Sequence, residues 1–250
     1  MSRFFVPPEN IGVRTIEITD PGDLHHMRRV LRLRPGDEVD VSDTDRWEYH
    51  ARIEILEEDS AMLTILDKQA FAAEPKTKVT LYQGIPKQGK LDGVVQKCTE
   101  LGVREIVPVF MDRTVVADRG NMGKKAERWR KIAAEAVKQC RRGIIPGVRD
   151  AVKMEDVLEE LAGFDLVLIP YENEESLSIK EALQDTDWRP PGRKERRIAL
   201  FIGPEGGFSD EEVHAVCSAG GRSVSLGRTI LRTETAGPAA LAMIMYELEL

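Results

Sequence analysis

The sequence predicts an α/β fold: a parallel sheet covered by helices on both faces, preceded by a small β-barrel domain. From residue 79 onward, apolar strand candidates alternate with helical segments, which is the pattern of parallel sheets buried on both faces. Residues 1–70 instead contain short strands and one helix. The 250 residues, of which 42% are hydrophobic, suffice for two domains of ordinary size. We expect domains at 1–72 and 73–250, joined by a linker within 71–78.

In the first domain, polar turns separate alternating or apolar runs. Strands are expected at 39–43, 49–56 and 61–66. A helix is expected at 23–33, because its apolar residues fall on one face. Pro35-Gly36 is expected to stop this helix.

In the second domain, strands are expected at 79–84, 105–110, 165–170, 198–203 and 223–226. Helices are expected at 90–101 and 124–141, where apolar residues recur on one face, and at about 234–248. Ser209 and Glu212 form a capping box that predicts one more helix start.

The distribution of charge along the chain is more informative about a nucleic-acid partner than the net charge is. The net charge of −7 and the pI near 5.3 argue by themselves against a nucleic-acid partner. However, residues 25–34 contain four arginines and no acid, and residues 124–142 contain eight Lys and Arg against two Glu. Each stretch alone is equally well read as a solvated face. Together they favour a local RNA-binding surface.

Several classes of protein are disfavoured. No apolar run approaches the roughly 18 residues of a membrane span, and the first ten residues lack a signal-peptide core. The three cysteines form no CxxC pair and the four histidines no HExxH pattern. We therefore expect a cytoplasmic protein without disulfides and without a metal.

Three of the predicted strands end in unusual loops, at 169–172, 203–207 and 226–232. Ligands of open parallel sheets bind beyond the carboxyl ends of the strands, so adjacent loops would wall one pocket. A glycine loop that opens a helix usually cradles phosphate, but the carboxylate of Glu205 would repel one. Ordinary tight turns, and a Glu205 that only caps the next helix, are the simpler alternatives.

The motifs of this region resemble those of a known family. "IGPEGGFSDEEV" (202–213) and "SLGRTILRTETAGPAAL" (225–241) resemble the carboxyl-terminal signature of the SPOUT methyltransferases, most closely the RsmE family. "GKLDGVVQKCTELGV" (89–103), "EAVKQCRR" (135–142) and "HHMRRVLRLRPGDEV" (25–39) resemble earlier motifs of the same family. The resemblance spans nearly the whole chain in order.

The resemblance implies methylation of N3 of a uridine in small-subunit (16S) ribosomal RNA, with S-adenosylmethionine (SAM) as cofactor. It also implies a deep trefoil knot in the carboxyl-terminal domain, a PUA-like RNA-binding amino-terminal domain and a homodimer. SAM carries a cationic sulfonium and no phosphate, which suits a glycine loop containing Glu205. The family's cofactor-binding loops correspond to Ile169, Pro170, Tyr171, Ile202, Gly203, Pro204, Glu205, Gly206, Gly207, Leu226, Gly227, Ile230 and Leu231.

The remaining candidate site residues are charged. Arg232 is the candidate for stabilising the uridine anion, although it could instead hold a phosphate. Glu234 could accept the proton, hold Arg232 or cap the last helix. In many members an arginine stands where this chain has Thr229, and Arg228 is its candidate replacement. The expected RNA contacts are His26, Arg28, Arg29, Arg32, Lys138, Arg142 and Arg228.

Other functions stay open at this stage. The enzyme could act on another RNA or on a ribose 2′-OH, or the chain could be a ribosome-assembly factor that binds RNA without catalysis. A phosphate-binding NTPase ranks last, because the sequence lacks GxxxxGK[ST].

Overall fold

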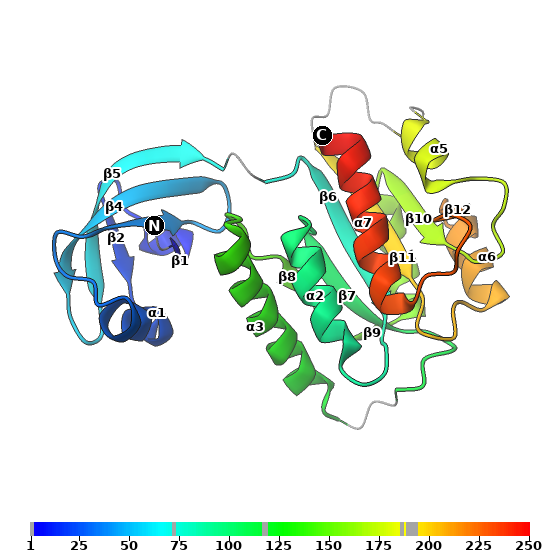
Figure 1. Cartoon of the computed structure of the whole chain (residues 1–250), viewed down its shortest axis with the longest axis horizontal. Coiled ribbons are helices and arrows are strands. Elements are labelled where there is room, and N and C mark those ends of the chain that lie inside the picture. The colour runs from blue at the N-terminus through cyan, green and yellow to red at the C-terminus, as the bar shows by residue number, and fades with distance from the viewer. Residues whose placement is uncertain (1–2, 72–73, 117–119, 186–187, 189–194) are drawn as a thin grey trace. The chain divides into compact units, whose positions relative to one another are not determined.

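The computed structural model describes residues 3–71, 74–116, 120–185, 188 and 195–250 (Figure 1). Contacts divide the chain into two units. One consists of Met1–Glu74 with Val137–Ile145, and the other of Pro75–Ala136 with Pro146–Leu250. The linker expected at 71–78 includes residues 72–73, which lie outside the described residues, and a strand already begins at Thr77.

The amino-terminal unit is a five-stranded half-barrel sheet. The strands are β1 (Arg3–Phe5), β2 (Thr15–Ile18), β3 (Glu38–Ser42), β4 (Trp47–Leu56) and β5 (Ala61–Ala70). Their order is β1-β3-β4-β5-β2, with β1 parallel to β3 and the other pairs antiparallel. Two register shifts in the β4–β5 pair bend the sheet around a core that includes Phe4, Ile16 and Ile53. The three expected strands are confirmed, whereas β1 and β2 are too short for a pattern to reveal.

The helix expected at 23–33 ends earlier than predicted. A short helix α1 (Pro21–His25) begins at Asp20, whose carboxylate accepts the N–H of Asp23, and it continues as a π-helical turn over His26–Val30. Arg32 has a φ of 55°, a left-handed conformation that ends a helix. The chain therefore leaves the helix before Pro35-Gly36, the expected stop signal.

The carboxyl-terminal unit contains a parallel sheet, as expected. Its strands are β6 (Thr77–Gly84), β7 (Glu105–Phe110), β8 (Gly147–Val148), β9 (Val152–Lys153), β10 (Leu166–Pro170), β11 (Arg196–Ile202) and β12 (Arg222–Val224). The strand order is β12-β10-β11-β6-β7-β8, with β9 also paired to β7. All these pairs are parallel.

Helices cover both faces of this sheet. They are α2 (Lys90–Glu100), α3 (Met122–Cys140), α4 (Met154–Leu158), α5 (Ile179–Gln184), α6 (Asp210–Ser218) and α7 (Thr233–Glu249). Helix α7 packs beside α2 and α5 on one face (Figure 1). Helix α4 packs beside α6 on the other face. The capping box of Ser209 and Glu212 at α6 is confirmed, whereas the short α4 and α5 were not expected.

The strand order brings four strand ends together. Strands β12, β10, β11 and β6 are neighbours and parallel, so their carboxyl ends meet at one edge of the sheet. Among the described residues, no helix is long and apolar enough to cross a membrane.

Candidate active site

A cavity of about 440 Å³ lies at this edge of the sheet. Its walls are the loops that follow β10, β11 and β12, together with the first residues of α2 and α7. Of the cofactor residues expected from the sequence, all except Ile169 and Gly206 line this cavity. Arg228, Arg232 and Glu234, for which we expected other roles, line it as well. The three loops thus form one pocket.

The two exceptions have clear structural reasons. Ile169 is fully buried in the core between the sheet and the helices α4 and α6. Gly206 faces away from the cavity and packs on Arg113, whose guanidinium donates to the Gly206 carbonyl at 2.9 Å. A Cβ on Gly206 would lie 3.0 Å from the Cβ of Arg113. The absence of a side chain at Gly206 therefore serves this contact.

Gly203 and Gly207 shape the cavity wall itself. A Cβ on Gly203 would lie 3.0 Å from the carbonyl carbon of Gly207, so a larger residue would require the backbone of the loop to shift. Gly207 has a φ of 70°, which side-chain-bearing residues rarely adopt. Its N–H donates to the carbonyl of Pro204 at 3.0 Å and closes the turn. The loop consequently presents bare backbone to the cavity.

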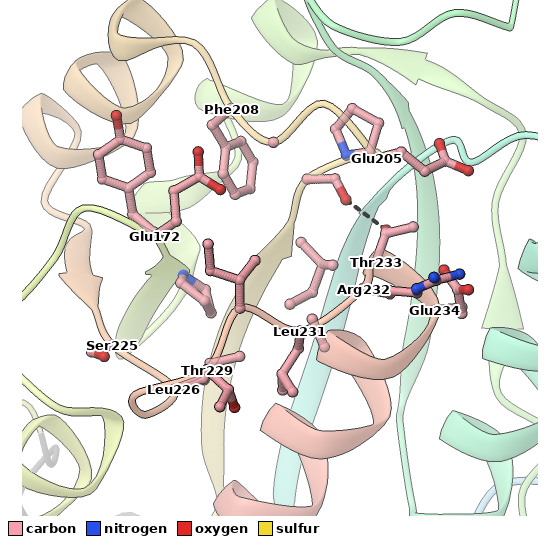
Figure 2. A pocket seen from close by; sticks show the side chains of 18 of the residues that line it. Glu172, Glu205, Phe208, Ser225, Leu226, Thr229, Leu231, Arg232, Thr233 and Glu234 are labelled. Atoms are coloured by element: carbon pink, nitrogen blue, oxygen red, sulfur yellow. Dashed lines mark hydrogen bonds between the residues drawn. The ribbon is translucent and has the colours of Figure 1, made fainter.

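A buried hydrogen-bond chain ties this loop to α7. The Gln83 side chain donates to the hydroxyl of Thr233 at 2.9 Å, and that hydroxyl donates to the carbonyl of Gly203 at 2.6 Å (Figure 2). Gly237, one turn into α7, lies against Gln83 and Leu81, where a larger residue would not fit without displacement. The first turn of α7 is therefore hydrogen-bonded directly to the β11 loop and also to β6.

One side of the cavity carries a cluster of opposite charges. The Lys90 ammonium lies 3.2 Å from a carboxylate oxygen of Glu205 and 3.3 Å from one of Glu234. The main-chain N–H of Lys87 also donates to Glu205, at 3.0 and 3.3 Å from its two oxygens. Glu205 thus joins the β11 loop to the segment between β6 and α2.

The pKa values of these carboxyls are low. Burial raises the pKa of Glu205, but hydrogen bonds from its own N–H and that of Lys87, together with the Lys90 ammonium, outweigh burial and bring it below the usual value. The pKa of Glu234 is lowered by its own N–H first, and then by Lys90 and Arg232. Both groups are carboxylates at neutral pH. An ionised, ion-paired Glu234 is a weak proton acceptor.

The cations of the cavity differ in their partners. Arg228 and Arg232 are both exposed. Within the part of the chain that the structure describes, neither makes an ion pair within 4.0 Å, whereas Lys90 contacts two carboxylates. The Arg232 main chain begins α7, because its carbonyl accepts the N–H groups of Thr235 and Ala236. Its guanidinium is therefore available to a ligand.

The opposite side of the cavity contains aromatic and acidic groups. Tyr171 donates to the Asp210 carboxylate at 2.6 Å, and this hydrogen bond raises the pKa of Tyr171. Figure 2 shows the side chains of Glu172 and Phe208 next to each other there. The lining residues absent from our expectation are Lys90, Phe208, Ser225, Thr233 and Ala236. Glu172 and Thr229 belong to the expected loops, although we did not name them as cofactor contacts. Lys90 was detectable in principle, because it begins a helix expected to follow the strand at 79–84.

Most of the RNA contacts that we predicted in the amino-terminal unit have accessible side chains. His26, Arg29 and Arg32 are exposed and Arg28 is half-buried, all within or just after the helical turn. Lys138 lies 3.5 Å from Asp23 and keeps a partly exposed side chain. These five residues remain candidates for RNA contact.

Arg142 has a different place from the one we expected. Only 5% of it is exposed, and its guanidinium donates to Glu74 at 2.9 Å. Glu74 also accepts the N–H groups of Gly143 and Ile144. Arg142 is thus buried in a satisfied ion pair within the amino-terminal unit and is not available to a phosphate. Among the described residues, no three His, Cys, Asp or Glu side chains gather in a way that would hold a metal ion.

Comparison with known proteins gives a consistent result. An "RNA methyltransferase domain" family matches residues 73–245, and an "RNA methyltransferase PUA domain" family matches residues 18–66. The ribosomal RNA small subunit methyltransferase E of Bacillus subtilis is 32% identical over 100% of this chain and 98% of its own length. That of Synechocystis is 33% identical over 99% of this chain and 78% of its own length.

Solved structures agree. The crystal structure of ribosomal RNA small subunit methyltransferase E from Neisseria gonorrhoeae, bound to SAM, superposes with a TM-score of 0.81. It is 30% identical, over 98% of this chain and 97% of the other. A methyltransferase structure from Legionella pneumophila, in complex with SAM, has a TM-score of 0.80 and 33% identity, over 98% and 96% of the two chains.

Proposed function

This chain belongs to the RsmE family of SPOUT RNA methyltransferases with a PUA domain, and on that basis we propose that it methylates N3 of a uridine in 16S ribosomal RNA, with SAM as the methyl donor. The single observation that carries this proposal is the cavity at the sheet edge. It is built by the three loops that the family resemblance assigns to the cofactor, and it includes Arg232, which has no ion pair among the described residues.

The residues of the cavity fit SAM. The glycine loop offers bare N–H and C=O groups that can read an adenine edge, and Ile202, Leu226 and Leu231 supply apolar contact. The carboxylates of Glu172, Glu205 and Glu234 suit a cationic ligand and oppose a phosphate. We therefore assign the cofactor contacts to the loop residues that line the cavity. When bound, SAM supplies an electrophilic methyl group on its sulfonium.

In the proposed mechanism the protein positions the base and stabilises its anion. Uridine N3 loses its proton to solvent water before or during methyl transfer, and negative charge spreads onto O2 and O4. With SAM as the donor, S-adenosylhomocysteine would be the leaving group. A fixed cation beside the base lowers the energy of that anion. We assign this role to Arg232, which is exposed at the cavity and unpaired within the described part of the chain. Arg228 is the next candidate.

The same proposal covers RNA binding and assembly. His26, Arg28, Arg29, Arg32 and Lys138 would contact phosphates of the substrate RNA. The domain division at 72/73, the trefoil knot, the homodimer and the cytoplasmic location belong to the proposal too. Exposed apolar side chains on α7 and next to it support a dimer: Met243, Tyr246 and Leu250, with Ile230.

The proposal is tested by methyl transfer from radiolabelled SAM to three substrates: purified small subunits, purified large subunits, and deproteinised small-subunit RNA. We expect label in small-subunit RNA and none in large subunits. Comparison of the first and third substrates shows whether the assembled particle is required. SAM binding without label in any small-subunit substrate would favour a binding protein without catalysis and would contradict the proposal.

A further inference from the structure

Lys90 is a charged residue of the cavity that the mechanism above does not use. It is the first residue of α2, and its ammonium bridges Glu205 and Glu234. The side chains of Lys90, Glu205 and Glu234 are 27–28% exposed, so the cluster lies at the mouth of the cavity rather than in the core. Its position beside the expected reaction centre calls for an explanation.

Lys90 is not needed to hold the cofactor loop. Glu205 keeps two hydrogen-bond contacts from the N–H of Lys87, and the loop is fixed independently through Thr233 and Gly203. Loss of the Lys90 charge would therefore leave the loop anchored. A purely structural role for Lys90 does not explain why it contacts Glu234 as well.

Glu234 has a second cation within reach. Figure 2 shows the Arg232 guanidinium and the Glu234 carboxylate on the same side of the cavity, and the charge of Arg232 helps to lower the pKa of Glu234. Nevertheless, in the described structure the ion pair of Glu234 is with Lys90 at 3.3 Å. The carboxylates of Glu205 and Glu234 lie on this side of the cavity with two cations, and both form their ion pair with Lys90.

We propose that Lys90 is a positioning residue that keeps Glu205 and Glu234 paired, so that the Arg232 guanidinium stays free for the anionic base. Without Lys90, Glu234 would pair with Arg232, and Glu205 would lose its ion pair. The anionic base would then lie beside an arginine whose charge is already neutralised and near the negative charge of Glu205. Such a change acts mainly on the reaction and less on RNA binding, because the uridine is neutral when it binds and becomes negative only as N3 loses its proton. This inference rests on the proposed function, since it presumes the role of Arg232.

The kinetic test is a double-mutant cycle of Lys90→Met and Glu234→Gln, because methionine keeps the side-chain length and removes the charge. The measured quantity is the single-turnover methylation rate at saturating SAM and small subunits. We expect Lys90→Met to lower the rate about tenfold in the wild-type background and less than twofold in the Glu234→Gln background. Lys90→Arg should recover most of the rate. SAM affinity should differ by less than about threefold between each variant that carries Lys90→Met and its parent with Lys90.

Lys78→Met is the matched control. It breaks a Lys–Glu ion pair of 2.7 Å, to Glu195, in the same unit and outside the cavity. We expect it to leave the methylation rate unchanged. A loss in this variant like that in Lys90→Met would mean that any broken surface pair slows the enzyme, and would overturn the inference.

A second readout does not depend on activity. Arg232 already acts on Glu234 at a distance, so the substitutions Arg232→Gln and Glu234→Gln should be weakly coupled in the unfolding equilibrium constant of the ligand-free wild type. If Lys90 separates the two side chains, this coupling should grow by about threefold in the Lys90→Met background. This cycle can be measured even if the chain methylates no uridine, so failure of the proposed function and failure of this inference are distinguishable.

Two further results would overturn the inference. A tenfold loss from Lys90→Met that persists in the Glu234→Gln background would mean that Lys90 contacts the substrate itself. The absence of increased coupling between Arg232 and Glu234 in the Lys90→Met background would mean that Glu234 does not turn to Arg232.

Discussion

Two ion clusters in the carboxyl-terminal unit are built on opposite plans. In the first, both outer nitrogens of Arg149 donate to Glu160 at 2.7 Å, and the hydroxyl of Tyr82 donates to the same carboxylate at 3.1 Å. The Tyr82 ring stacks on Phe201 with 4.8 Å between centroids. In the second, Lys90 makes one longer contact with each of two carboxylates.

The difference teaches what each cluster can do. Both outer nitrogens of Arg149 donate to one carboxylate, which fixes the geometry of the pair and keeps the guanidinium in an ion pair. Lys90 is a point charge shared between two loops, and it leaves the Arg232 guanidinium without an ion pair in the described structure. The first cluster is suited to stability and the second to binding an anion.

The largest expected effect comes from exchanging Arg232, beside the second cluster, for alanine, and the comparison is with Arg149 of the first cluster. Arg232→Ala should lower single-turnover methylation at saturating RNA by about 10²–10³, the usual cost of removing a transition-state contact of about 3–4 kcal/mol. SAM affinity should stay within a few-fold, because the guanidinium is assigned to the base. Arg232→Lys should recover only part of the rate, since it lacks the planar fork.

Arg149→Ala should do the reverse. It leaves Glu160 unpaired beside the buried Tyr82, so we expect a loss of about 1–2 kcal/mol in unfolding free energy and a methylation rate near that of the wild type below the melting transition. Both variants are compared by thermal unfolding and single-turnover kinetics. Loss of SAM binding in Arg232→Ala would mean that Arg232 contacts the cofactor instead of the base. An Arg149→Ala variant with normal stability and a lowered methylation rate would contradict the assignment of the first cluster to stability.

An intermediate effect is expected from the glycines around the second cluster. Gly203→Ala should lower SAM affinity at least about tenfold, because the new Cβ would meet the backbone of Gly207 and displace the loop. Gly93→Ala in α2 is the matched control, since no atom lies within 4 Å of its Cβ position. It should leave SAM affinity unchanged and raise stability by about 0.5–1 kcal/mol. Calorimetric titration with SAM measures the affinity of both variants. A Gly203→Ala variant with the same affinity as Gly93→Ala would mean that the cofactor does not bind at this loop.

The smallest expected effect is the pH dependence of the first cluster. Arg149 lowers the pKa of Glu160 in the folded protein, below the value of about 4.3 for an unfolded glutamate. The ion pair therefore contributes stability above about pH 4.3 and loses it as the pH falls through the folded pKa. Glu160→Gln should cost under about 1 kcal/mol at pH 7. The difference in melting temperature from the wild type should shrink between pH 5 and pH 3, and a difference that grows on acidification would contradict this sign.

Much of the site was predictable because it depends on strand ends. Parallel strands that end in glycine-rich or arginine-containing loops bring those loops to one edge, so the three cavity loops could be expected from the sequence. The capping box at Ser209 was equally visible, because it is a local pattern. These features follow from neighbouring residues and from the fold class, and both can be inferred from a single sequence.

The rest depended on contacts between distant segments. Nothing in the sequence around Lys90 indicates that it pairs with Glu205 and Glu234, more than 100 positions away. The burial of Arg142 against Glu74 was hidden for the same reason, because a basic run looks alike whether its last residue is solvated or paired. Strands β8 and β9, of two residues each, are too short to show a period.

The most direct test of the whole account is the chemical identity of the methylated nucleoside. Small subunits methylated by the wild-type chain would be digested to nucleosides, and the labelled product identified by chromatography and mass spectrometry. The account predicts 3-methyluridine, because the cavity pairs a methyl donor with an arginine that stabilises a uridine anion. A 2′-O-methylated nucleoside would contradict it, because methylation of a ribose hydroxyl forms no uridine anion for Arg232 to stabilise.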